Sequence, residues 1–162
     1  MRMSRMEIEQ VVPSNIKDVW AFFSSPQNLN DLTPPDLRFR IVSVSVPRMY
    51  TGQLIEYRIR ILPGIWYPWL TEIRHVREEE YFVDEQRAGP YKFWYHEHHF
   101  VQEKAGVRIV DRVTYSVGFG FIGTLINWLW VRRKLEGVFE YRRKRIEELF
   151  VKPTVKKQRM RS

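Results

Sequence analysis

Apolar and polar residues alternate along most of the chain, which is the pattern of β-strands that bury one face. Between residues 53 and 62, for example, Ile55, Tyr57 and Ile59 fall on one face and charged residues fall on the other. Turn signals rich in Gly and Pro separate such segments. Together they predict strands over residues 5–12, 39–46, 53–62, 66–76, 81–86, 93–103 and 107–117.

Three other segments place apolar residues at helical spacing. Residues 14–23 predict a helix capped by Ser14, and residues 26–32 predict a short second helix that ends before Pro34. A long helix is predicted over residues 122–150. It carries one apolar stripe, made of Trp128, Val131, Leu135, Phe139, Ile146 and Leu149.

The order of these elements predicts an α+β fold with a single domain over residues 1–150. A curved antiparallel sheet of about six to seven strands must cover its apolar face, and the C-terminal helix is the only large element left to do so. A sheet that grips a helix in this way often encloses a cavity. Arg142 lies within the apolar stripe of that helix, and its side chain can reach either the sheet or solvent. We expect residues 151–162 to form a basic, disordered tail.

Composition adds that the interior is rich in rings. Hydrophobic residues make up 44% of the chain and aromatic residues 15%, which excludes a disordered protein and indicates an aromatic core or a cavity lined with rings. The absence of cysteine excludes disulfides and thiolate sites, and the N-terminus lacks the apolar core of a signal peptide. We therefore expect a cytoplasmic protein.

The net charge of +8 is concentrated at the C-terminal end. From Arg132 onward the chain carries twelve cationic and four acidic residues, so this segment accounts for the whole excess. Such a run is either a solvated helix face or a contact for an anionic membrane or nucleic acid. The preceding run, residues 117–131, is apolar but too short for a membrane span of about twenty residues. It is either covered by loops or a partner, or it forms an exposed apolar rim that touches membranes transiently.

Three of the four histidines lie in the segment KFWYHEHHF, residues 92–100. Because side chains alternate along a strand, His96 and His98 share one face, while His99 lies on the other. The KAG sequence after residue 103 predicts a two-residue turn. Counting back from this turn pairs Phe100 with Ile109, His98 with Asp111, His96 with Val113 and Trp94 with Tyr115. His99 and His75 are expected at the surface.

Three interpretations of this inner polar group stay open. In the first, the carboxylate of Asp111 and the imidazole of His98 satisfy each other inside an apolar face. In the second, they are polar anchors of a ligand cavity. In the third, two histidines and a carboxylate bind zinc or iron, or His98 and Asp111 form an acid–base pair. No G-x-S-x-G or H-E-x-x-H motif accompanies them, and we expect no metal and no cofactor.

Three phrases in this layout resemble a known superfamily. They are FVDEQRAGPYKFWYHEHHF at residues 82–100, DRVTY at residues 111–115 and GFGFIG at residues 118–123. They are similar to the SRPBCC or START-like superfamily, in its bacterial polyketide cyclase/dehydrase-like or cell-division-inhibitor-like branch. The resemblance implies a helix-grip fold with a cavity for an apolar ligand, and it implies no particular reaction.

The sequence therefore favours a non-catalytic protein that binds or transports an apolar small molecule, lipid-like or aromatic. An alternative is a cyclase- or dehydratase-type enzyme that uses His98 with Asp111. A third possibility is peripheral association with a membrane or a nucleic acid through the basic C-terminus, and of these two partners nucleic acid is the less expected. The predicted cavity wall consists of Tyr57, Ile59, Trp69, Phe82, Asp84, Gln86, Trp94, His96, His98, Phe100, Asp111, Val113, Tyr115, Trp128, Leu135 and Phe139.

Overall fold

A computed structural model describes residues 3–37, 39–44, 46–62, 64–117 and 127–151. In chain order its elements are β1 (Ser4–Val12), α1 (Ile16–Phe23), the 3-10 helices η1 (Pro26–Leu32) and η2 (Pro35–Leu37), β2 (Phe39–Val44), β3 (Leu54–Leu62), β4 (Ile65–Arg77), β5 (Tyr81–Ala88), β6 (Phe93–Glu103), β7 (Gly106–Ser116), the π-helical turn η3 (Asn127–Val131) and α3 (Arg132–Val151). The predicted basic tail over residues 152–162 lies outside the described residues.

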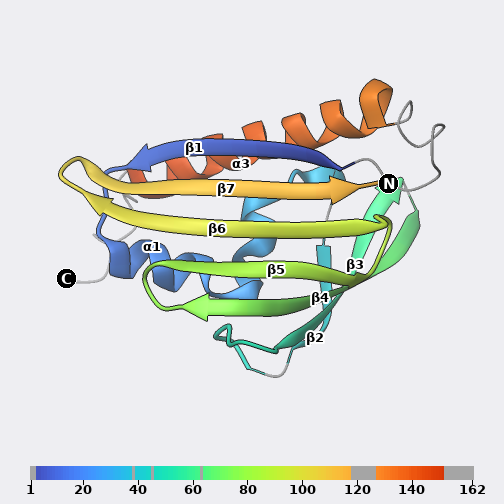
Figure 1. Cartoon of the computed structure of the whole chain (residues 1–162), viewed down its shortest axis with the longest axis horizontal. Coiled ribbons are helices and arrows are strands. Elements are labelled where there is room, and N and C mark those ends of the chain that lie inside the picture. Colours follow the sequence, from blue (N-terminus) through green and yellow to red (C-terminus); the bar gives the residue numbers. More distant parts are fainter. Residues whose placement is uncertain (1–2, 38, 45, 63, 118–126, 152–162) are drawn as a thin grey trace, which may run out of the picture.

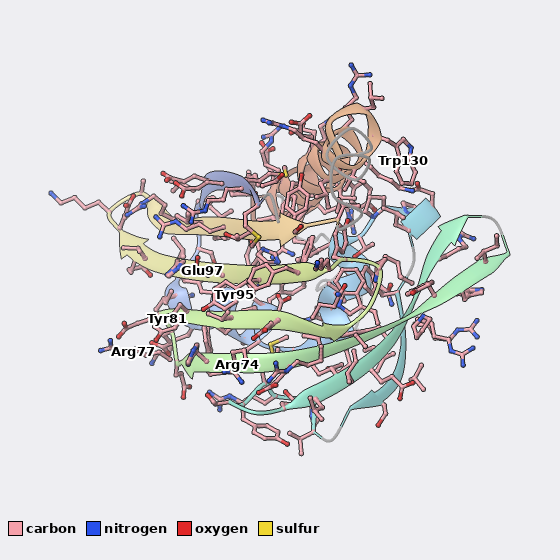
Figure 2. The ribbon with its side chains drawn as sticks, turned by 45° about the vertical axis from the view of Figure 1, so that its right-hand side comes forward. Arg74, Arg77, Tyr81, Tyr95, Glu97 and Trp130 are labelled. Atoms are coloured by element: carbon pink, nitrogen blue, oxygen red, sulfur yellow. The ribbon has the colours of Figure 1, made fainter. Side chains whose placement is uncertain are left out.

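The seven strands form one antiparallel sheet in the order β1-β7-β6-β5-β4-β3-β2. Helix α3 lies alongside β1, and α1 packs against β6 and β7 (Figure 1). This confirms the predicted α+β fold, in which a curved sheet wraps around a C-terminal helix. The outer face of the sheet carries polar and charged side chains such as Arg74, Tyr95 and Glu97, which point away from the helices (Figure 2).

Several boundaries differ from the predictions, among them those of α1, β2 and α3. The cap of α1 is Asn15 and not Ser14, because the Asn15 side-chain oxygen accepts a hydrogen bond from the backbone N–H of Asp18 at 3.0 Å. Strand β2 ends at Val44, two residues earlier than predicted. Helix α3 begins at Arg132, after the π-helical turn, and the predicted start at residue 122 lies outside the described residues.

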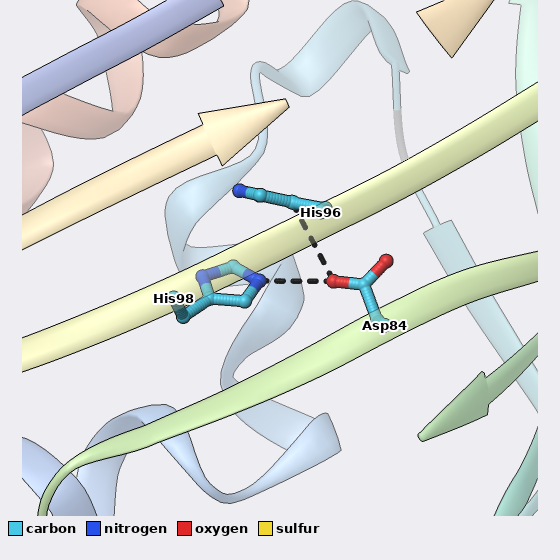
Figure 3. Close-up of side chains that lie close together, drawn as sticks. All are labelled: Asp84, His96 and His98. Atoms are coloured by element: carbon cyan, nitrogen blue, oxygen red, sulfur yellow. Dashed lines mark hydrogen bonds and ion pairs between the residues drawn. The ribbon is translucent and has the colours of Figure 1, made fainter. Parts of the chain in front are cut away.

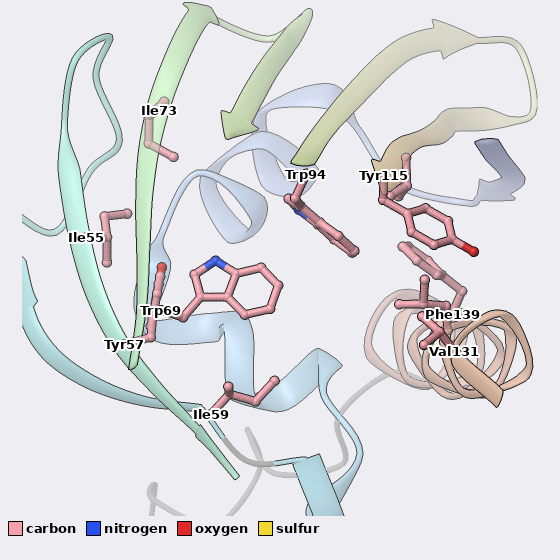
Figure 4. Packing of buried hydrophobic residues seen from close by; sticks show 11 residues of the cluster. Ile55, Tyr57, Ile59, Trp69, Ile73, Trp94, Tyr115, Val131 and Phe139 are labelled. Carbon is pink, nitrogen blue, oxygen red and sulfur yellow. The ribbon is translucent and has the colours of Figure 1, made fainter. Parts of the chain in front are cut away.

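One cluster of buried side chains joins the strands to α3. Its large aromatic residues face one another across the space between the sheet and the helix (Figure 4). The members are Ile55, Tyr57, Ile59, Trp69, Ile73, Trp94, Val113, Tyr115, Val131, Leu135 and Phe139. These rings come from strands β3, β4, β6 and β7 and from α3, so the cluster fixes the sheet and the helix relative to each other.

A second cluster surrounds α1 and the other end of α3. Trp20 packs edge-on against Phe82 and Phe100, and Phe23 also meets Phe100 edge-on. Ile146 of α3 completes this cluster, and only 1% of its surface is exposed. Helix α3 is therefore anchored to the sheet near both of its ends by apolar side chains. The part of α3 between the two clusters carries Arg142, which is also buried.

The register of the β6–β7 hairpin agrees with the prediction at every pair. His98 lies opposite Asp111 and His96 opposite Val113, and Glu103 pairs with Gly106 across the turn. Gly106 has φ +136°, and a Cβ atom there would lie 1.9 Å from the carbonyl oxygen of Val12. A residue without a side chain is thus required where the hairpin turn meets the end of β1.

We expect Gly106→Ala to lower the free energy of unfolding by at least about 2 kcal/mol, because it combines a strained φ with a backbone clash. Gly137→Ala is the matched control, since Gly137 lies on α3 with open space around its Cα. That change should stabilise the protein by about 0.5–1 kcal/mol, as alanine favours helix more than glycine does. Urea unfolding of both variants measures the difference, and equal midpoints would contradict the expected constraint at the hairpin.

Candidate functional site

A pocket of about 420 Å³ lies between the inner face of the sheet, the short helices and α3. This volume is within the range of roughly 300–1,000 Å³ that is typical of small-molecule sites. Apolar and aromatic side chains make up most of its wall. A small polar group on β5 and β6, formed by Asp84, His96 and His98, interrupts the apolar lining.

Ten of the residues predicted for the cavity wall line this pocket. They are Tyr57, Ile59, Trp69, Phe82, Asp84, Trp94, His96, His98, Leu135 and Phe139. All lie on inward positions of β3 to β6 or on the stripe of α3, so the strand alternation and helical spacing were enough to find them.

The structure places five of the other predicted residues away from the pocket surface. Phe100 packs within the second cluster, and Val113 and Tyr115 are buried in the first. Asp111 lies behind the two histidines, and the Gln86 side chain instead bonds the backbone of Tyr91. The remaining predicted residue, Trp128, has a side chain outside the described part of the structure.

Several lining residues come from segments that the sequence did not connect to the cavity. The short helices, the start of β2 and the loops contribute Phe22, Phe23, Leu29, Leu32, Leu37, Phe39, Met49 and Tyr91. Trp69, Tyr91 and Trp94 form a group of rings, with centroids 4.9–5.8 Å apart between Tyr91 and the two indoles. Tyr91 follows a Gly-Pro turn, where no periodicity indicates which way a side chain points.

The polar group is part of a larger network, in which the carboxylates of Asp84 and Asp111 lie on either side of the two histidines. His98 bonds both of them: its Nδ1 lies 2.7 Å from Asp111 Oδ1, and its Nε2 lies 2.9 Å from Asp84 Oδ2. His96 Nε2 lies 3.0 Å from the same oxygen of Asp111, and His96 Nδ1 lies 3.5 Å from Asp84 Oδ2. Trp94 Nε1 donates to the other oxygen of Asp84 at 3.2 Å. Figure 3 shows the two imidazoles converging on Asp84.

Arg142 completes the network from the opposite side. Its side chain reaches inward from α3, although the sequence left both directions open. Its Nη2 lies 3.3 Å from Asp111 Oδ1, and its guanidinium stands 5.2 Å from the ring centre of Phe23. Only 10% of this side chain is exposed, so its charge needs a partner inside the protein, and Asp111 is that partner.

Burial disfavours charge on every member of this network, so the partners decide which groups stay ionised. For Asp111, the charge of Arg142 and the histidine hydrogen bonds outweigh burial and hold its pKa well below the ordinary value. For Asp84, the contacts with the two imidazoles and the Trp94 indole likewise outweigh burial and lower the pKa.

The pKa values of the two histidines shift in opposite directions. Burial is outweighed at His98 by hydrogen bonds to Asp111 and Asp84, and its pKa rises. At His96, burial and the neighbouring charge of His98 together lower the pKa. The favoured state therefore has two carboxylates balanced by the Arg142 guanidinium and the His98 imidazolium, with His96 neutral.

Asp84, His96 and His98 also stand close enough to share a metal ion. Each offers one ligand atom, and these atoms lie within 4.8 Å of one another. This was the interpretation that the sequence favoured least, because the third ligand depended on an inferred register and the family resemblance does not imply a metal.

The turn before α3 belongs to the apolar run for which the sequence left both a covered and an exposed position open. Leu129 and Trp130 are each 52% exposed, and Trp130 also lines the pocket. The Lys134 ammonium lies 4.9 Å from the centre of the Trp130 ring. No helix in the described ranges is long and apolar enough to cross a membrane. Contact of this rim with anionic membranes stays a prediction.

Comparison with known proteins identifies the fold. No family model and no curated protein matches the sequence. Among solved structures, TTHA0849 from Thermus thermophilus is 21% identical, with a TM-score of 0.64 over 91% of this chain and 97% of that one. SA2116 from Staphylococcus aureus, a protein of unknown function, has a TM-score of 0.71 at 11% identity, over 93% and 94% of the two chains.

A plant protein shares the same arrangement. The ginseng major latex-like protein 151 from Panax ginseng is 12% identical, with a TM-score of 0.63 over 93% of this chain and 99% of that one. These likenesses show the fold, which is the helix-grip arrangement of a curved antiparallel sheet around a C-terminal helix.

We expect Arg142→Met to lower the free energy of unfolding by about 3 kcal/mol. The change keeps an apolar stem but leaves the Asp111 carboxylate buried without its guanidinium. Arg143→Met is the matched control, because Arg143 is exposed and pairs with Glu140 on the helix surface, where ion pairs contribute little. Urea unfolding at neutral pH should leave the control midpoint near that of the wild type. An Arg142→Met midpoint equal to the control would contradict the role of Arg142.

Proposed function

We propose that this protein binds an apolar small molecule in the pocket between the sheet and α3. The observation that carries the proposal is the pocket itself: about 420 Å³ of space with a mostly apolar wall, in which the buried polar group of Asp84, His96 and His98 lies beside a few other polar side chains such as Lys134 and Arg142. The resemblance of the sequence to START-like proteins supports the same function, as does the helix-grip fold. A protein that only needed stability would gain from filling this space with side chains.

The wall indicates the kind of ligand. Trp69, Tyr91 and Trp94 offer ring faces and edges that suit an aromatic or polycyclic body. The polar group of Asp84, His96 and His98 lies on the same wall and can pair with one polar end of such a molecule. We therefore propose a ligand with an extended apolar body and a single polar end.

Filling the pocket should abolish binding. Val138 lies on the pocket wall, and Val138→Trp would place an indole in the ligand space. We expect this variant to bind the neutral fluorescent probe N-phenyl-1-naphthylamine at least tenfold more weakly than the wild type. Glu136→Trp adds the same ring to the same helix at a residue whose side chain is 51% exposed, and it should bind as the wild type does.

Fluorescence titration measures all three affinities, and circular dichroism checks that both variants are folded. A wild-type protein that does not enhance probe fluorescence would refute the proposal. Equal affinity for the probe in Val138→Trp and the wild type would place any binding elsewhere.

A second candidate function is acid–base catalysis of the cyclase or dehydratase kind. One observation favours it: His98 and Asp84 both line the pocket, so a protonated His98 could donate to a bound molecule. Asp111 would then act from behind by orienting His98, since it does not reach the pocket. Recovery of an altered molecule after incubation with the protein, in place of the ligand that was added, would favour this function over binding alone.

A further inference from the structure

Three side chains on neighbouring strands each bring one ligand atom toward a common point. Asp84 Oδ2 lies 2.9 Å from His98 Nε2 and 3.5 Å from His96 Nδ1. Two ligands bound to one zinc ion at about 2.0–2.1 Å, with tetrahedral angles, are about 3.3 Å apart. The two separations that involve Asp84 thus lie within a few tenths of an ångström of this spacing, and all three ligand atoms lie within 4.8 Å of one another.

The other nitrogen of each histidine is already held. His96 Nε2 and His98 Nδ1 both bond Asp111 Oδ1, at 3.0 and 2.7 Å. Metal-bound histidines usually donate their second N–H to a carboxylate, which fixes the tautomer and the ring orientation. Here one carboxylate orients both rings, and Arg142 holds that carboxylate in place.

The three ligand residues also have the right surroundings for a reactive site and not only a structural one. All three line the pocket, so an ion between them would be reached from the ligand space. Catalytic zinc sites commonly use two histidines and one carboxylate and keep one position open. A structural site would instead have four protein ligands.

We propose that Asp84, His96 and His98 bind a divalent transition-metal ion of the zinc type, with an open coordination position facing the pocket. This goes beyond the binding of an apolar molecule, because the ion can bind whether or not a ligand is present. The donor set of two imidazoles and one carboxylate suits zinc, cobalt or ferrous iron and disfavours calcium and magnesium.

Charge balance indicates what would occupy the open position. A divalent ion held by two neutral imidazoles and Asp84 lies beside Asp111 and Arg142. The two carboxylates, the guanidinium and the ion together leave one excess positive charge, which is costly in an apolar surrounding. An anionic oxygen on the polar end of the pocket ligand, such as a carboxylate or an enolate, would restore neutrality.

The test uses the metal alone, without any apolar ligand. Isothermal titration of the chelator-treated protein with Zn²⁺ should show one equivalent bound, and Co²⁺ should give the visible absorption bands of a low-coordinate ion. Asp84→Asn should weaken binding at least a hundredfold while preserving the shape of the side chain. His98→Gln should have a similar effect.

His99→Gln is the matched control. His99 lies on the opposite face of β6, where its Nε2 stands 3.6 Å from Glu97, so it is also a histidine beside a carboxylate. This variant should bind Zn²⁺ as the wild type does. Absence of stoichiometric binding in the wild type would overturn the proposal, as would full binding by folded Asp84→Asn. Neither result would alter the outcome expected for probe binding to the pocket.

Discussion

The carboxylate of Asp111 is buried in the interior, and the surrounding polar structure follows from the need to compensate its charge. Only 6% of this side chain is exposed, so its charge is separated from water and must be matched by partners within hydrogen-bond reach. His96, His98 and Arg142 supply those partners from β6 and α3. The same bonds that satisfy Asp111 fix the orientation of both imidazoles, so their remaining nitrogens face Asp84 and the pocket.

This arrangement explains how a polar group persists beside an apolar cavity. Two clusters of packed rings hold α3 at separate places, and the space between them is not filled by side chains. The charged network lies at that gap, and its balance of two negative and two positive groups lowers the cost of keeping it out of water. Arg142 lies on α3 and Asp111 on β7, so the network also ties the helix to the sheet.

Much of this architecture could be predicted from local patterns. Strand alternation put His96 and His98 inside, and the short turn before Gly106 set the β6–β7 register that pairs His98 with Asp111. The second carboxylate was harder to place, because the link between β5 and β6 is longer and does not define a register. The side chain of Arg142 points inward because the Asp111 carboxylate on β7 needs a cationic partner. The spacing of residues within α3 gives no sign of that partner. The loop residues of the pocket lacked any periodic signal.

The protonation of the two inner histidines tests this account most directly. Long-range ¹H–¹⁵N NMR of the metal-free protein near pH 6.5, the ordinary histidine pKa of about 6.5, reports the proton on each ring nitrogen. We predict that His98 is mainly protonated on both nitrogens, while His96 is mainly neutral with its proton on Nε2. A neutral His98, or a His96 that becomes charged before it as the pH falls, would contradict the balanced network centred on Asp111.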